Sequence, residues 1–166
     1  MAAPIRFLDI LRTLCGHEVD FVVVGGVAAI LEGAPVATFD LDIMHRRSED
    51  NHQRLLAALG ELNARYADPA GRTILPDTLK LETLQLHRLI TDSGPLDVLT
   101  EIAPGLGYDD VLDEAVVYDL AGLDVRVLSL EAVIRSKEHA NRDKDRAALP
   151  LLRQTLSLKA RGRSQV

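Results

Sequence analysis

The amino-acid sequence predicts an α+β fold, in which flanking helices pack on a mixed, twisted sheet and the C-terminal part is helical. Short β-branched apolar runs alternate with segments whose apolar residues recur at helical spacing. A chain of 166 residues, of which 47% are apolar, is long enough for one domain with a sizeable core. We expect that domain to span residues 1–158, followed by a basic flexible tail at 159–166.

The first part of the chain predicts two helices and two strands. Apolar residues recur at helical intervals over residues 5–14 and predict a helix that ends at Gly16. The apolar run 21–24 is typical of a buried strand, and residues 27–33 predict a short helix. A second strand is expected at Thr38–His45.

The remaining elements follow from caps, turns and periodicity. Ser48 offers a cap for a helix to about Leu62, whereas residues 63–83 give no clear prediction. Residues 84–102 indicate two strands joined through a turn at Asp92–Pro95. The last predicted elements are a short helix near Tyr108–Glu114, a strand pair at 115–120 and 123–129, a helix that Ser129 caps, and a final helix with Leu149, Leu152 and Leu156.

Composition excludes several classes of protein. The longest uncharged apolar run, Phe21–Leu31, is shorter than the roughly 18 residues of a membrane span. Charges at Arg6, Asp9 and Arg12 interrupt the region where a signal peptide would be apolar. The single cysteine, Cys15, cannot form an internal disulfide. We therefore expect a cytoplasmic protein that does not contact a membrane.

The charge distribution offers only local sites for polyanions. A net charge of −6 makes the whole chain a poor non-specific binder of nucleic acid. Basic residues gather at 45–47 and 135–146, although such runs are usually solvated faces. The five histidines show no pair at zinc spacing. His87 and Arg88, close to Asp97 in the sequence, are the polar residues to watch.

Two aspartates stand one residue apart in the second predicted strand, where charged residues are disfavoured. Asp40 and Asp42 would point to the same face of that strand. If the strand carrying Asp97 pairs beside Thr38–His45, three carboxylates meet at one edge, and a cation such as Mg²⁺ would offset their repulsion. The alternative is that Asp40 caps a turn and Asp97 lies on a solvated face.

A paired glycine, Gly25 and Gly26, ends the first strand and precedes a helix. Backbone amides and a positive helix end would face outward there, an arrangement suited to phosphate. A tight turn alone also needs glycine. The chain lacks the lysine and hydroxyl of a P-loop and the dinucleotide fingerprint. The informative feature is the combination of this turn with the acid pair and the lone acid.

Four motifs in order resemble a known family: VVGG, TFDLDI, PLDVL, and LSLEAVIRSKEHANRDKDRAALPLL. Together they run from about Asp20 to Leu152. The chain resembles the nucleotidyltransferase superfamily with the DNA-polymerase-beta-like fold. It is most similar to the minimal bacterial branch that includes toxin components of abortive-infection and toxin–antitoxin systems.

The resemblance implies roles for residues in the first three motifs. Gly25 and Gly26 would cradle the triphosphate of a nucleoside triphosphate, and Thr38 would belong to the same nucleotide site. The acid pair at positions 40 and 42 would bind Mg²⁺ or Mn²⁺. Asp97 would bind metal or help to deprotonate the attacking hydroxyl.

The last motif implies cations on the nucleotide. Lys137, followed by Asp145, would contact a phosphate, with Arg142 as a second cation. Many relatives have a serine where this chain has Val27 and an arginine where it has Val36. Phosphate binding would therefore depend on backbone amides and on Lys137.

The implied activity moves a nucleoside monophosphate from a nucleoside triphosphate to an acceptor hydroxyl and releases pyrophosphate. The acceptor could be a tRNA end, a protein or a small molecule. A silent module of the same fold that binds nucleotide or a cognate partner protein, as one half of a toxin–antitoxin pair, is the alternative. A third reading is an interaction protein whose acids are surface charges.

Overall fold

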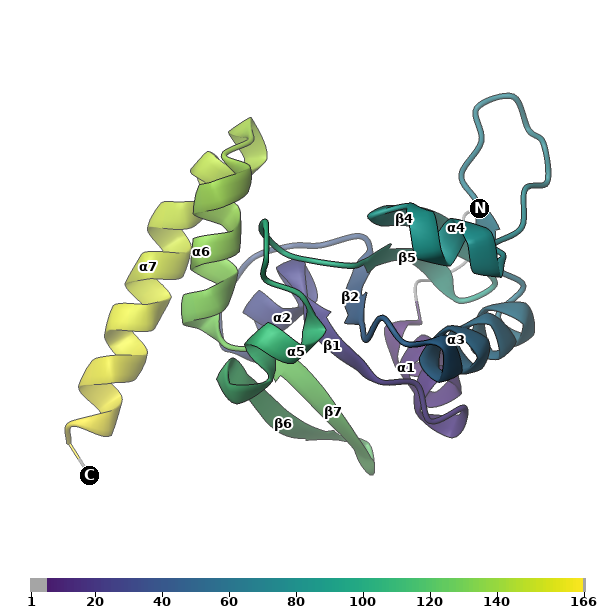
Figure 1. The fold of residues 1–166 in the computed structure, drawn as a ribbon. Helices are drawn as coiled ribbons and strands as arrows, with labels where there is room; N and C mark the ends of the chain where they lie inside the picture. Colours follow the sequence, from purple (N-terminus) through teal and green to yellow (C-terminus); the bar gives the residue numbers. More distant parts are fainter. Residues whose placement is uncertain (1–5, 166) are drawn as a thin grey trace.

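A mixed sheet of seven strands in the order β3-β4-β5-β2-β1-β7-β6 runs through the molecule (Figure 1). The structure is a computed structural model that describes residues 6–165. The strands are β1 (Phe21–Val24), β2 (Leu41–His45), β3 (Arg65–Tyr66), β4 (Leu86–Thr91), β5 (Gly94–Leu99), β6 (Ala115–Leu120) and β7 (Leu123–Leu128). The predicted α+β fold is confirmed.

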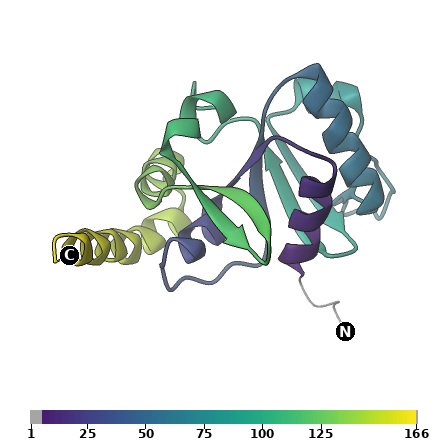
Figure 2. The ribbon, with the colours of Figure 1, turned by 90° about the horizontal axis from the view of Figure 1, so that it is seen from below.

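Helices flank this sheet at both ends. They are α1 (Phe7–Gly16), α2 (Gly25–Leu31), α3 (Glu49–Glu61), α4 (Thr78–Thr83), α5 (Tyr108–Val111), α6 (Leu130–Ala140) and α7 (Asp143–Arg163), with a 3-10 turn η1 (Leu112–Glu114). Helices α6 and α7 form a pair at one end of the molecule, away from α1 and α3 at the other (Figures 1 and 2).

The middle of the sheet is the most buried part of the fold. All four residues of β1 are buried, and in β2 only Asp42 is not. Strand β1 is antiparallel to β2 and parallel to β7, while β2 is parallel to β5. A charged residue is costly to bury in so apolar a strand, and its register partner in β5, Asp97, adds a second carboxylate beside it.

Two predicted helix caps are confirmed. The Ser48 side chain accepts a hydrogen bond from the Asn51 amide, and the Ser129 side chain accepts one from the Ala132 amide. Each cap satisfies one of the free amides of the first helical turn. These caps fix the start of α3 and of α6, and α6 is the helix that carries Lys137.

The second predicted strand is too long at its start. Strand β2 begins at Leu41, so residues 38–40 precede it. Pairing with β1 reaches only the pair Val24 and Asp42, where β1 turns into α2, and pairing with β5 reaches the pair Leu41 and Leu96. Residues 38–40 therefore pair with neither neighbouring strand.

Other segments differ in smaller ways. Helix α2 begins at Gly25 rather than at residue 27, and residues 63–83 contain β3 and α4. Helix α7 continues to Arg163, so residues 159–163 of the expected tail are helical. Residues 1–5 and 166, which the predicted domain and tail include, lie outside the described residues. Among residues 6–165, no helix has the length and apolar character needed to cross a membrane.

Candidate active site

Three carboxylates meet at the end of the central strands. Asp42 in β2 and Asp97 in β5 are register partners in a parallel pair. Asp40, although it precedes β2, joins them, and ligand oxygens of all three residues lie within 4.8 Å of one another. We call Asp40, Asp42 and Asp97 the acid cluster. The structure thus brings together the three acids that the sequence indicates.

The acid cluster has an excess of negative charge. Burial raises the pKa of Asp42 to about 7, and the neighbouring Asp40 and Asp97 add to the rise, against the weaker opposing effect of Lys137 and Lys144. Burial, followed by the charge of Asp40, also raises the pKa of Asp97. Three crowded carboxylate oxygens suit a hard divalent cation, so the residues present fit Mg²⁺ or Mn²⁺.

The paired glycine has a steric reason to be there. Gly25 has φ +64°, and a Cβ at this position would overlap the Asp42 carboxylate. A Cβ on Gly26 would lie 2.8 Å from Cβ of Thr38, which is too close for any real side chain. The Thr38 hydroxyl in turn donates to the backbone oxygen of Asp40 at 3.1 Å. The two glycines therefore let the turn approach the acid cluster.

The acid cluster opens into a cleft of about 550 Å³. The cleft is lined by the turn at Gly25 and Gly26 with residues 36–40, by the strands β2, β4 and β5, and by a helical wall from α6 and α7. Basic residues that line this cleft are Arg88, Lys137, Arg142 and Lys144. A space of this size that holds both acids and bases suits a charged small ligand.

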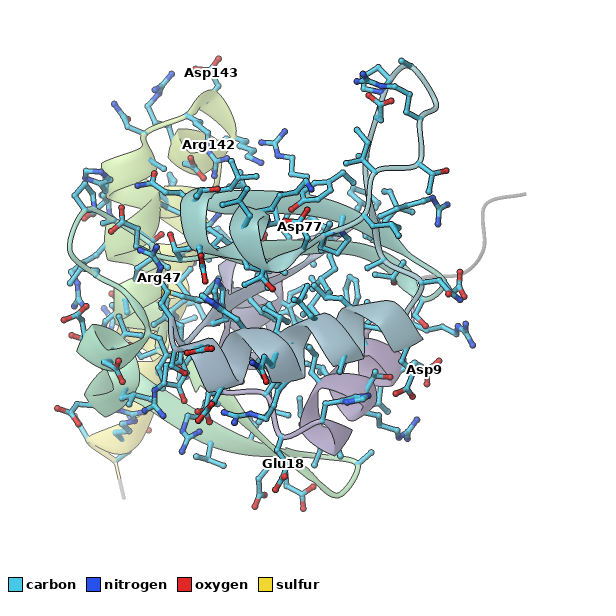
Figure 3. All side chains as sticks on the ribbon, turned by 45° about the vertical axis from the view of Figure 1, so that its right-hand side comes forward. Asp9, Glu18, Arg47, Asp77, Arg142 and Asp143 are labelled. Carbon is cyan, nitrogen blue, oxygen red and sulfur yellow. The ribbon has the colours of Figure 1, made fainter. Side chains whose placement is uncertain are left out.

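A buried carboxylate holds two of these cations. Asp145 is fully buried, its oxygens lie 2.7 Å from Nε of Arg142 and 3.5 Å from Nζ of Lys137, and it also accepts the Arg142 amide at 3.2 Å. Burial opposes ionisation of Asp145, but the hydrogen bonds from Arg142 and the charge of Lys137 outweigh it and lower its pKa. Arg142 lies at the corner where α6 leads into α7 (Figure 3).

The cleft contains residues that sequence reasoning did not select. Phe39 lines the cleft with 77% of its surface exposed, and Lys144 and Ser136 lie on the helical wall. The basic run at 135–146 is a sequence signal that could have pointed to Lys144. No such signal exists for Phe39, because its exposure depends on the path of the loop before β2. Arg88, singled out only as a residue to watch, lines the cleft as well.

Other polar residues of the sequence analysis lie elsewhere. His87 is fully buried, and its Nδ1 lies 2.6 Å from the Tyr66 hydroxyl. Among residues 45–47, His45 is fully buried and Arg46 pairs with Asp20 at 2.9 Å. Arg47 is exposed and donates to the backbone oxygen of Glu82 at 2.8 Å, so both arginines of this run have partners within the protein.

Comparison with known families decides the class of protein. The profile of the aminoglycoside-2''-adenylyltransferase family matches residues 6–151. The chain belongs to this family. It is therefore a nucleotidyltransferase, and the superfamily inferred from its motifs is confirmed. A comparison with curated proteins gives no significant match.

Solved structures of other nucleotidyltransferases share this fold. A protein of Thermotoga maritima described as a candidate nucleotidyltransferase is 20% identical, with a TM-score of 0.55 over 88% of this chain and 92% of that one. ANT(2'')-Ia, solved as a crystal structure with adenylyl-2''-tobramycin, is 16% identical, with a TM-score of 0.55 over 96% and 95% of the two chains. The solution structure of the same resistance factor gives a TM-score of 0.56 and 16% identity over 96% and 90%.

Proposed function

We propose that this nucleotidyltransferase transfers AMP from ATP to a hydroxyl of a small-molecule acceptor and needs Mg²⁺ or Mn²⁺ to do so. The observation that carries the proposal is the acid cluster, whose oxygens lie within 4.8 Å of one another in a cleft that also holds cations. Charged triphosphate chemistry needs both kinds of group in one place. Membership of an adenylyltransferase family favours ATP over other nucleotides.

The helical wall would bind the triphosphate. Lys137 and Arg142 are held at the cleft by Asp145, and Lys144 lines the same wall. Cations that are already oriented lose less freedom on binding phosphate. The turn at Gly25 and Gly26 lines the same cleft, where backbone amides would add donors. Thr38 lies close against this turn, since a Cβ on Gly26 would come within 2.8 Å of its Cβ.

The acid cluster would hold the divalent ion, which supplies charge neutralisation for the α-phosphate and for the departing pyrophosphate. The pKa of about 7 for Asp42 supports this role, because that carboxylate lacks a sufficient positive partner among the residues around it. Asp40, Asp42 and Asp97 would supply oxygen ligands to this ion, and Mg²⁺ typically takes phosphate oxygens of the substrate as well.

The transfer itself would be an in-line displacement. The acceptor oxygen attacks the α-phosphorus and forms a new P–O bond, while the bond between that phosphorus and the bridging oxygen breaks. Pyrophosphate leaves with the electron pair, and a carboxylate oxygen of Asp97 accepts the hydroxyl proton.

Two observations support a small acceptor. The chain aligns with 95% of the ANT(2'')-Ia chain, a protein solved with an adenylylated tobramycin. The cleft of about 550 Å³ is in the range of small-molecule sites. A tRNA end and a protein side chain are the competing acceptors, and a toxin-like role would require one of these.

The test follows the label of α-³²P-ATP with Mg²⁺ and three acceptor pools: small metabolites and antibiotics, total RNA, and total protein. We expect label in a small-molecule product with wild type and with Asp124→Asn, an exposed control on β7. Asp42→Asn should give none. Label in an RNA or protein band would show that the acceptor is RNA or protein and would contradict a small-molecule acceptor. Bound ATP without transfer in any pool would favour the silent module.

A further inference from the structure

Arg88 occupies the flank of the acid cluster that the nucleotide residues leave open. It is the register partner of Asp97 across the antiparallel pair β4 and β5, so both side chains lie on one face of the sheet. The alternation along β4 agrees, since His87 and Leu89 are buried while Leu86 and Arg88 are exposed. Within residues 6–165, the Arg88 side chain forms no ion pair or hydrogen bond.

The strand order separates Arg88 from the glycine turn. The acid cluster lies on and beside β5 and β2, with β4 on one flank and β1 on the other. Neighbouring strands are about 4.8 Å apart, so Arg88 and the turn after β1 lie roughly 14 Å apart across the sheet. The acid cluster therefore lies between the glycine turn on one flank and Arg88 on the other.

The geometry of an in-line displacement indicates that the acceptor binds on the Arg88 side of the acid cluster. Attacking and leaving oxygens lie on opposite sides of the phosphorus. If pyrophosphate leaves toward Gly25, Gly26 and Lys137, the acceptor approaches from the β4 flank. This step rests on the proposed function, which places the triphosphate on the glycine side.

The β4 flank has the wrong charge for a polycation. Its cleft-lining groups are Arg88 with the apolar side chains Leu86 and Leu99. Among the described residues, the carboxylates that line the cleft are the acid cluster and Asp145, which already holds Lys137 and Arg142. With a divalent ion offsetting most of the charge of the acid cluster, Arg88 would repel the ammonium groups of an aminoglycoside on this flank.

We propose that Arg88 determines acceptor specificity by binding a phosphate group of the acceptor beside the hydroxyl that is adenylylated. A guanidinium can hold two phosphate oxygens at once, which also fixes the orientation of the acceptor. The substrate class is therefore a phosphorylated hydroxy compound, and aminoglycosides are poor acceptors for this family member.

Calorimetry tests the assignment with the protein saturated by Mg²⁺ and α,β-methylene-ATP, which fills the nucleotide side. Ribose 5-phosphate, ribose and tobramycin are then titrated into wild type, Arg88→Gln and Arg88→Lys. Arg12→Gln, which removes an exposed arginine on α1, is the matched control. We expect ribose 5-phosphate to bind more tightly than ribose or tobramycin, and Arg88→Gln to weaken it about tenfold or more.

Each outcome bears on a different claim. Equal affinity of wild type and Arg88→Gln for ribose 5-phosphate overturns the role of Arg88, as does tighter binding of tobramycin than of ribose 5-phosphate. Weaker binding of α,β-methylene-ATP by Arg88→Gln would show that Arg88 binds the nucleotide, and this result also overturns its role in binding the acceptor. If wild type does not bind the ATP analogue, the proposed function itself fails, and the inference fails with it.

Discussion

The Asp42 carboxylate occupies the space that a side chain at position 25 would need. Gly25 has φ +64°, a backbone conformation that side chains disfavour, and it lies where β1 turns into α2. One residue thus sets both the path of the turn and the position of a predicted metal ligand. The glycine motif is therefore part of the acid site as well as a candidate phosphate cradle.

Replacing this glycine should damage the site more than the fold. Gly25→Ala would push Asp42 away and would add roughly 1–2 kcal/mol of backbone strain. We expect metal-dependent AMP transfer to fall at least tenfold, measured with labelled ATP. Gly60→Ala, in α3 with open space around its Cβ, should stabilise the protein by about 1 kcal/mol and keep full activity. Equal activity of Gly25→Ala and Gly60→Ala would contradict a role of Gly25 in positioning Asp42.

Asp145 should act on nucleotide binding through the cations it holds. Asp145→Asn removes a buried charge that contacts Arg142 at 2.7 Å and Lys137 at 3.5 Å. Because both cations retain solvent contact, we expect a loss of about 1–3 kcal/mol in the free energy of unfolding. The KM for ATP should rise at least fivefold while the affinity for Mn²⁺ changes little.

The matched control is the neighbouring residue in the same helical turn. Asp143 is 98% exposed, so Asp143→Asn should change stability by less than about 0.5 kcal/mol. A KM for ATP that rises equally in both variants would show that charge near α7, and not the positioning of Lys137 and Arg142, matters.

A buried histidine should make folding sensitive to mild acid. Burial lowers the pKa of His45 to about 4, and its ring lies 5.2 Å from that of His52. Between pH 6.5 and 4 the unfolded chain therefore binds a proton that the folded protein excludes. Stability rises with pH across this window, and His45 alone accounts for roughly 3 kcal/mol of it.

Denaturant unfolding at pH 7 and pH 4.5 measures this effect. His45→Leu removes the titrating group from the buried site, so the variant should lose less stability on acidification than wild type does. Other acid-sensitive groups are common to both proteins and cancel in the comparison. Equal losses in wild type and variant would contradict the assignment of this window to His45.

The sequence predicts the acid cluster because aspartate in an apolar strand is a local anomaly. Asp42 and Asp97 each stand between buried neighbours, and this pattern is visible without coordinates. Ser48 and Ser129 predict helix starts for the same reason, since a cap acts within a few residues. Features that depend only on residues close in the sequence can therefore be predicted without knowing the fold.

Features that depend on distant partners could not be predicted. The start of β2 is set by how far its pairing with β1 and β5 extends, and the register that places Arg88 opposite Asp97 also depends on strand pairing. Exposure of Phe39 depends on how residues 36–40 lie beside the cleft. The cleft itself exists because α6 and α7 pack at one end of the sheet, a contact that no single segment specifies.

The central claim is that Asp40, Asp42 and Asp97 form the metal site of this nucleotidyltransferase. The most direct measurement is Mn²⁺ binding, followed by electron paramagnetic resonance of the free ion, for wild type, Asp42→Asn and Asp124→Asn. We predict saturable binding by wild type and by Asp124→Asn, and at least tenfold weaker binding by Asp42→Asn. Equal Mn²⁺ affinity of all three proteins would contradict the claim.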